Sequence, residues 1–321
     1  MVKSDVLIFI DANQYLKLYQ MTNENGKEIL NLLIELQDYI FITAQVVEEV
    51  QRSKLKVVAH RLTERVKQLG EWPRLSKYLI DASGGAIDSL LKKFKDFAQA
   101  DEQTLKLIQQ SEDVLSKKLS VLFEKGTKLK YEREELCRAR DRRERGNPPG
   151  KSEDPLGDQL TWEQLLGHFR GKSKLWVITE DVDYIVKHDG KPLLHAFLYQ
   201  DLAQVSRKPL DVFCFTDPLT GLKDFVKSME LKAKSVPSEK KSEEIRKELD
   251  ALPPPSSAMD WQSITNFSGF RRMIPTIPNN PTPYTLSIDQ GKIWNFVAEN
   301  QSTEAPSLTE VILTAPPSGA Q

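Results

Sequence analysis

Acidic residues recur in this sequence where its apolar segments end. They are Asp11, Glu48, Glu49, Asp158, Asp181 and Asp183. Carboxylates that converge repel one another and raise one another's pKa, unless a cation lies among them. A set of oxygen ligands without a cluster of His or Cys favours Mg²⁺, and such an ion can activate a water for hydrolysis of a phosphodiester. The residue types therefore indicate metal-dependent hydrolysis of a phosphate ester.

Each of these acids also has an ordinary explanation when it is taken alone. An Asp after a strand often caps a helix or forms a turn, which would suffice for Asp11, Asp158 and Asp183. The adjacent pair Glu48 and Glu49 would suit a solvated helix face, and only one of the two can point into a given site. Acids follow several of the predicted strands, and this repetition favours a metal site.

The elements that must position these acids are predicted from the pattern of apolar residues. Four apolar runs are predicted as strands, and helical patterns at 26–37, 158–169 and 193–205 separate them. The predicted strands are residues 5–10, 39–43, 175–179 and 211–215. This alternation predicts a doubly wound α/β fold around a parallel sheet, in which ligands bind at the carboxyl ends of the strands. The acids after the strands would lie at that edge, and Asp158 would join them if its helix begins nearby.

Two further regions differ from this pattern. Residues 48–146 carry helical spacing without a strand signal, and breaks are expected near Pro73 and at Gly84. Most of the 18 prolines lie after residue 235, where a linker and a weakly ordered extension are expected. We therefore predict a domain over residues 1–227 with a helical insertion at about 55–146, followed by an extension over 228–321.

The bulk composition excludes several classes of protein. The chain has 321 residues, a net charge of −1 and two cysteines, which are far apart and lack a CxxC spacing. A disulfide framework or a structural zinc site is therefore not expected. No apolar run approaches the roughly 18 residues that a bilayer requires, and no signal peptide is evident, so a cytoplasmic location without a membrane partner is expected.

Four segments in order resemble the motifs of the PIN domain superfamily, in its bacterial PIN-like branch with a long helical insertion. The segments are IFIDANQYLKLY, FITAQVVEEVQR, RRERGNPPGKSEDPLGDQLTWEQLL and VITEDVDYI. Within the second segment the family register favours Glu49 over Glu48, because an apolar residue, Val50, follows it. Tyr184 stands in the fourth segment where this branch often has Trp.

The resemblance implies a three-layer α/β/α fold and an acidic pocket that binds Mg²⁺ or Mn²⁺. It implies hydrolysis of single-stranded RNA by a metal-activated water, which leaves a 5′-phosphate and a 3′-hydroxyl. Asn13 and Thr179 would orient the carboxylates by hydrogen bonds. Carried over by position, the metal ligands would be Asp11, Glu49, Asp158 and Asp181, with Asp183 as an auxiliary ligand.

A basic segment precedes Asp158 and could bind the phosphates of the substrate. Its arginines are Arg138, Arg140, Arg142, Arg143 and Arg145. They could equally complete a long helix and pair with acids one turn earlier, such as Glu134.

The leading interpretation is thus a metal-dependent ribonuclease, with RNA as a partner and a protein partner or inhibitor in addition. The setting is left open between a toxin, a defence system and RNA processing. The alternative is a catalytically inactive PIN-like module that binds RNA or protein. A phosphatase is disfavoured because Asp11-Ala12-Asn13 lacks the second Asp of an Asp-x-Asp nucleophile, and a flap nuclease needs more acids than these.

Overall fold

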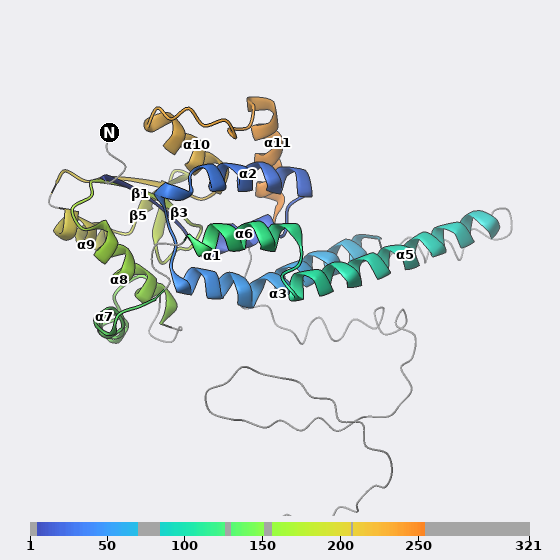
Figure 1. The fold of residues 1–321 in the computed structure, drawn as a ribbon, viewed down its shortest axis with the longest axis horizontal. Helices are drawn as coiled ribbons and strands as arrows, with labels where there is room; N and C mark the ends of the chain where they lie inside the picture. The colour runs from blue at the N-terminus through green and yellow to red at the C-terminus, as the bar shows by residue number, and fades with distance from the viewer. Residues whose placement is uncertain (1–4, 70–83, 126–129, 151–155, 207, 254–321) are drawn as a thin grey trace, which may run out of the picture. The chain divides into compact units, whose positions relative to one another are not determined.

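The computed structural model describes residues 5–69, 84–125, 130–150, 156–206 and 208–253 (Figure 1). Strands and helices alternate along this part of the chain, as the following bounds show. They are β1 (Val6–Ile10), α1 (Ala12–Leu18), α2 (Asn23–Glu35), η2 (Gln37–Tyr39), β2 (Ile40–Phe41), α3 (Ala44–Leu69), α5 (Gly84–Gln109), α6 (Val114–Glu124), α7 (Arg133–Glu144), α8 (Gly157–Phe169), β3 (Lys174–Ile178), β4 (Ile185–His188), β5 (Lys191–Leu194), α9 (Ala196–Ser206), β6 (Asp211–Phe215), α10 (Pro218–Ser228) and α11 (Glu239–Ala251). None of the helices within these ranges combines the length and apolarity needed to cross a membrane.

A four-stranded sheet forms the centre of the fold. Its order is β2-β1-β3-β6, and every neighbouring pair is parallel. Each residue of β1 is buried, since the run VLIFI is apolar on both faces and both faces are covered by helices. The α/β fold with a central parallel sheet, predicted from the four apolar runs, is therefore confirmed.

The two faces of the sheet belong to separate apolar clusters. Val6, Ile8 and Ile10 point into one cluster, which includes residues of α1, α2, α10 and α11. Leu7 and Phe9 point to the other face, where α8 and α9 pack. This alternation follows from the two-residue period of a strand and produces helices on both sides of the sheet.

An antiparallel hairpin of β4 and β5 was not predicted from the sequence. Val186 lies opposite Leu193, and both side chains are exposed, whereas Ile185 is buried against the core. The helix predicted over 193–205 therefore begins later, at Ala196, because residues 193 and 194 complete β5.

The helical insertion divides into two parts. Helices α3 and α5 lie side by side (Figure 1). Helix α6 instead packs on the core of the domain, where Leu119, Leu122 and Phe123 are buried. The break expected at Gly84 coincides with the start of α5, and the break expected near Pro73 lies outside the described residues.

The extension expected from residue 228 begins too early, because α11 belongs to the domain. Ile245 and Leu249 are buried in the same cluster as β1, and the Glu248 carboxylate accepts hydrogen bonds from Thr22 and Asn25 of the α2 region. The sequence of α11 is dominated by charged residues, so its two anchoring side chains gave no strong signal. The proline-rich segment after residue 253 lies outside the described residues.

Candidate active site

Asp11 lies at the carboxyl end of β1 and is held there by three hydrogen bonds. The Ala12 N–H donates to Oδ1 at 2.7 Å, while Thr179 Oγ1 and Asn13 Nδ2 donate to Oδ2 at 2.7 and 2.6 Å. Asp11 is thus also the N-cap of α1, as its position after a strand allowed. Burial nevertheless raises the pKa of this carboxyl to about 7, and the Glu49 and Asp181 charges add to the rise.

The segment after β3 brings a second acid to the same edge. The Asp11 N–H donates to the carbonyl of Ile178 at 3.1 Å, so the ends of β1 and β3 are adjacent. Thr179 Oγ1, which holds Asp11, also accepts from the N–H of Asp181 at 3.0 Å. The carboxylate of Asp181 accepts from the N–H of Asp183 at 2.8 Å, which closes a tight turn. One hydroxyl therefore links the positions of Asp11 and Asp181.

An ion pair with a buried lysine fixes Glu180, the residue between Thr179 and Asp181. Lys17 Nζ of α1 lies 2.7 Å from Glu180 Oε1, and the lysine side chain is 4 % exposed. Glu180 is thereby directed toward α1. No sequence motif marked Lys17, since its partner lies far along the chain.

Helix α3 supplies Glu49 to the site. Glu49 is partly buried, and burial raises the pKa of its carboxyl, a rise that Arg52 opposes and Asp181 increases. Glu48 is exposed and lies 3.6 Å from Arg52 on the solvent side of the helix. The two adjacent acids therefore point in different directions, and Glu49 is the one whose charge acts on Asp11 and Asp158.

Asp158 lies in the first turn of α8, close to the other acids. Burial raises the pKa of its carboxyl to about 8, and the charges of four acids contribute further. These four are Asp11, Asp181, Glu49 and Asp183, in decreasing order. Gly157, directly before Asp158, lies against Gln45 of α3: a Cβ at this position would lie 2.8 Å from Cδ of Gln45 and would displace that side chain.

The fold thus gathers acids from four separate segments, and each feels the charge of others. As the side chains lie, no three His, Cys, Asp or Glu residues of the described chain form a group that could hold a metal ion. The donor set still fits a hard divalent cation, because it consists of carboxylates whose burial and mutual repulsion such a cation would relieve.

Two buried tyrosines near the acids were not predicted as site residues. Tyr184 Oη donates to the main-chain carbonyl of Asp158 at 3.4 Å, and its ring contacts those of Phe9 and Trp162. Tyr15, on α1, is also buried, and burial together with the charge of Asp11 raises the pKa of its hydroxyl. In the sequence, these two tyrosines could not be distinguished from ordinary core residues.

The basic segment before Asp158 divides into buried and exposed arginines. Arg142 is 8 % exposed and forms ion pairs with Glu163 and Asp201 at 2.7 and 2.8 Å. It is committed to buried partners, which removes it from the predicted phosphate-binding set. Arg138 is half-exposed and forms ion pairs with Glu134 and Glu163. The pair with Glu134 agrees with the alternative in which these arginines pair with acids one helical turn earlier. Arg140 and Arg145 are exposed and Arg143 is partly so, and their role toward phosphates stays a prediction.

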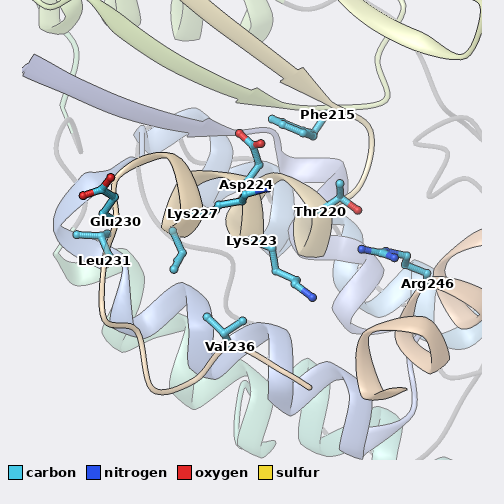
Figure 2. A pocket seen from close by; sticks show the side chains of 10 residues that line it. Phe215, Thr220, Lys223, Asp224, Lys227, Glu230, Leu231, Val236 and Arg246 are labelled. Atoms are coloured by element: carbon cyan, nitrogen blue, oxygen red, sulfur yellow. The ribbon is translucent and has the colours of Figure 1, made fainter. Parts of the chain in front are cut away.

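A surface groove of about 550 Å³ lies apart from these acids (Figure 2). Its walls come from α10, the segment that follows it, and α11, and its basic side chains are Lys223, Lys227 and Arg246. Lys223 is already bound to Glu239 at 2.7 Å. None of the acids that end the strands lines this groove.

The arrangement agrees with the comparison of the sequence with known families. The PIN like domain family matches residues 7–191, which is more than half of the chain. This chain is a member of the PIN-like domain family. Its members are generally nucleases, and the match contains the acids proposed from the sequence as metal ligands, Asp11, Glu49, Asp158, Asp181 and Asp183. It ends at the start of β5, although β6 completes the sheet of this PIN-like domain by pairing with β3. No curated protein and no solved structure matches the chain.

Proposed function

We propose that this chain is a metal-dependent nuclease that hydrolyses single-stranded RNA. The observation that supports the proposal is the proximity of acids from four segments: the charges of Glu49 and Asp181 raise the pKa of Asp11, and those of Asp11, Asp181 and Glu49 raise the pKa of Asp158. Buried like charges are costly to the fold, and such clusters occur preferentially at functional sites. Membership of a family that generally consists of nucleases gives the cluster a function.

The proposed ligands of Mg²⁺ or Mn²⁺ are these four carboxylates, with Asp183 as an auxiliary ligand. When bound, such an ion activates a water molecule and stabilises the charge on a phosphodiester. The chain itself orients the ligands: Thr179 and Asn13 hold Oδ2 of Asp11, and the same Thr179 hydroxyl holds the main chain of Asp181. These bonds leave the side chains few alternative positions, which lowers the cost of ordering them around an ion.

The substrate would be held by charge outside the acidic cluster. Arg140, Arg143 and Arg145 lie on and just after α7, in the segment that leads toward Asp158. Their charges would attract the phosphates of a nucleic acid without reading its sequence. Hydrolysis by water would then leave a 5′-phosphate and a 3′-hydroxyl.

Cleavage of a labelled single-stranded RNA by the full chain tests this proposal. The reaction would be run with Mn²⁺, Mg²⁺ or EDTA for the wild type, for Asp11→Asn and for Asp189→Asn. Asp189 is the matched control, because its side chain is 87 % exposed in the turn between β4 and β5. We expect cleavage that EDTA and Asp11→Asn abolish and Asp189→Asn preserves. Equal cleavage by Asp11→Asn, or none by the wild type with either metal, would refute the proposal.

A further inference from the structure

Arg142 has an environment unlike that of the other arginines of α7. Its guanidinium donates from Nε to Glu163 Oε1 at 2.9 Å and from Nη1 to the carbonyl of Pro148 at 2.8 Å. Nη2 lies 2.7 Å from Glu163 and 2.8 Å from Asp201. The group also lies over the ring of Phe197, at 5.9 Å from its centroid. All three nitrogens of the guanidinium are therefore engaged inside the protein.

The partners of Arg142 surround the helix that carries Asp158. Glu163 lies on α8, the helix whose first turn contains Asp158. Pro148 belongs to the segment that leads from α7 to α8, and Asp201 lies on α9, which packs beside α8. Asp201 also accepts from Nε1 of Trp162, the residue before Glu163, at 3.1 Å. The Arg142 guanidinium thus links α8 to α7 and α9 and to the segment that precedes α8.

These contacts require the shape of a guanidinium. A planar group with five N–H donors can serve three acceptors in different directions at once, whereas a lysine ammonium is a single charge at the end of a flexible stem. The buried carboxylate of Glu163 also needs a cation, since an unpaired buried charge is strongly destabilising. Arg138 donates to the other oxygen of Glu163 but is 49 % exposed, and within the described part of the chain it forms no hydrogen bond or ion pair with Pro148 or Asp201.

We propose that Arg142 is a positioning residue of the active site, which sets where α8 presents the Asp158 carboxylate to the other acids. The proposal rests on the function proposed above, because it assigns Asp158 to the metal site. Arg142 does not contact the substrate in this account. It acts through Glu163, Pro148 and Asp201 on the orientation of α8.

The test compares full-length Arg142→Met with Arg133→Met, which removes an exposed arginine from the start of the same helix. Mn²⁺ affinity is measured by calorimetry, and kcat and KM are measured on a single-stranded RNA. Hydrogen exchange of residues 160–163, which include the Leu160 N–H bonded to the Leu156 carbonyl in the first turn of α8, is followed without metal. Arg142→Lys shows whether charge alone is sufficient.

We expect Arg142→Met to weaken Mn²⁺ binding by about tenfold or more, to lower kcat, to leave KM within about twofold, and to speed exchange in residues 160–163. Arg133→Met should stay within about twofold of the wild type in each quantity, and Arg142→Lys should be nearly as impaired as Arg142→Met. Wild-type metal affinity and kcat in Arg142→Met would overturn the proposal. A rise in KM alone would also overturn it, because that result indicates a phosphate contact.

Two further outcomes are decided by the same measurements. If the wild type neither binds Mn²⁺ nor cleaves RNA, the proposed function fails. Arg142 is then judged by hydrogen exchange alone, where an unchanged first turn of α8 in Arg142→Met overturns its positioning role. If Arg142→Met does not fold, the double variant Arg142→Met with Glu163→Gln takes its place, because it leaves no charge unpaired at Glu163.

Discussion

At the scale of single residues, the site is an arrangement of carboxylates that destabilise one another. The pKa of Asp11 is raised from 3.8 to about 7 and that of Asp158 to about 8, in both cases first by burial and then by neighbouring acids. A carboxyl whose pKa is higher in the folded state binds more protons there than in the unfolded state. Its contribution to stability is therefore present at low pH and is lost as the pH rises through the folded pKa.

This linkage predicts the pH dependence of the metal-free protein. In EDTA, the melting temperature of the wild type is expected to fall between about pH 4 and about pH 8, the window between the ordinary and the raised pKa values. Asp158→Asn should show a shallower fall, and at pH 8.5 it should melt about 2–4 °C higher than the wild type for each kcal/mol of repulsion removed. Calorimetric melting at several pH values checks this, and identical slopes for the two proteins would contradict it.

The same residues show what a sequence reveals at this scale. The places of Asp11, Asp158 and Asp181 could be predicted because each stands next to a strand end or a helix start, while their role as metal ligands stays a prediction. Arg142 could not, because its buried ion pairs depend on Glu163 and Asp201, which only the tertiary structure brings to it. Tyr184 was visible only as a departure from a pattern, and its bond to the carbonyl of Asp158 is likewise a tertiary contact.

At the scale of elements, the approach of α8 to α3 decides whether Asp158 and Glu49 can act together. Gly157 starts α8 directly before Asp158, and a Cβ there would lie 2.8 Å from Cδ of Gln45 on α3. The contact is closer than a Cβ can tolerate, so a side chain at this position must displace the flexible side chain of Gln45.

Gly157→Ala is accordingly expected to turn the Gln45 side chain aside and to lower kcat by less than about tenfold, short of the effect of a displacement of about 1 Å in a catalytic group. The substitution itself suits a helix, since Ala has a higher helix propensity than Gly. The double variant with Gln45→Ala removes the crowding atoms and should recover most of the activity. RNA cleavage by the two variants checks this, and an inactive double variant would show that the glycine is needed for another reason.

The elements also differ in how far the sequence predicts them. The parallel strands are continuous apolar runs, so the sequence predicted them as strands. Strand β2 is shorter than predicted and covers only Ile40–Phe41. Tyr39 belongs to η2, and the Thr43 hydroxyl accepts a hydrogen bond from the N–H of Val46 at the start of α3. The hairpin β4–β5 was missed because each strand has only two aliphatic residues beside its polar ones and one strand contains Pro192. Its stability depends on burial of Ile185, which is a tertiary contact.

At the scale of the whole molecule, the domain extends beyond the region with PIN-like motifs. The match to the family ends at residue 191, yet β6 completes the sheet and α11 packs on the cluster beneath β1. The domain boundary predicted from composition, at residue 227, lies before α11 because the content of proline and charged residues increases there. Burial of Ile245 and Leu249 nevertheless holds α11 on the domain.

Two truncations test the extent of the domain. A chain that ends at residue 227 loses Ile245, Leu249 and the Glu248 bonds to Thr22 and Asn25, whereas one that ends at residue 253 keeps them. Removing two buried aliphatic side chains costs several kcal/mol, at about 2–5 for each. The shorter chain should therefore melt lower than the longer one by about 8 °C or more, at about 2–4 °C per kcal/mol. Equal melting temperatures would place the boundary before α11.

The central claim is that the four acids bind one class of divalent cation, and adjacent glutamates give the sharpest test. Mn²⁺ would be titrated calorimetrically into the wild type, Glu49→Gln and Glu48→Gln at one pH. Both substitutions remove the same charge from the same turn of α3, but only Glu49 acts on Asp11 and Asp158. The account predicts that Glu49→Gln weakens Mn²⁺ binding by about tenfold or more, while Glu48→Gln binds like the wild type. Equal binding by the two variants, or no binding by the wild type, would contradict it.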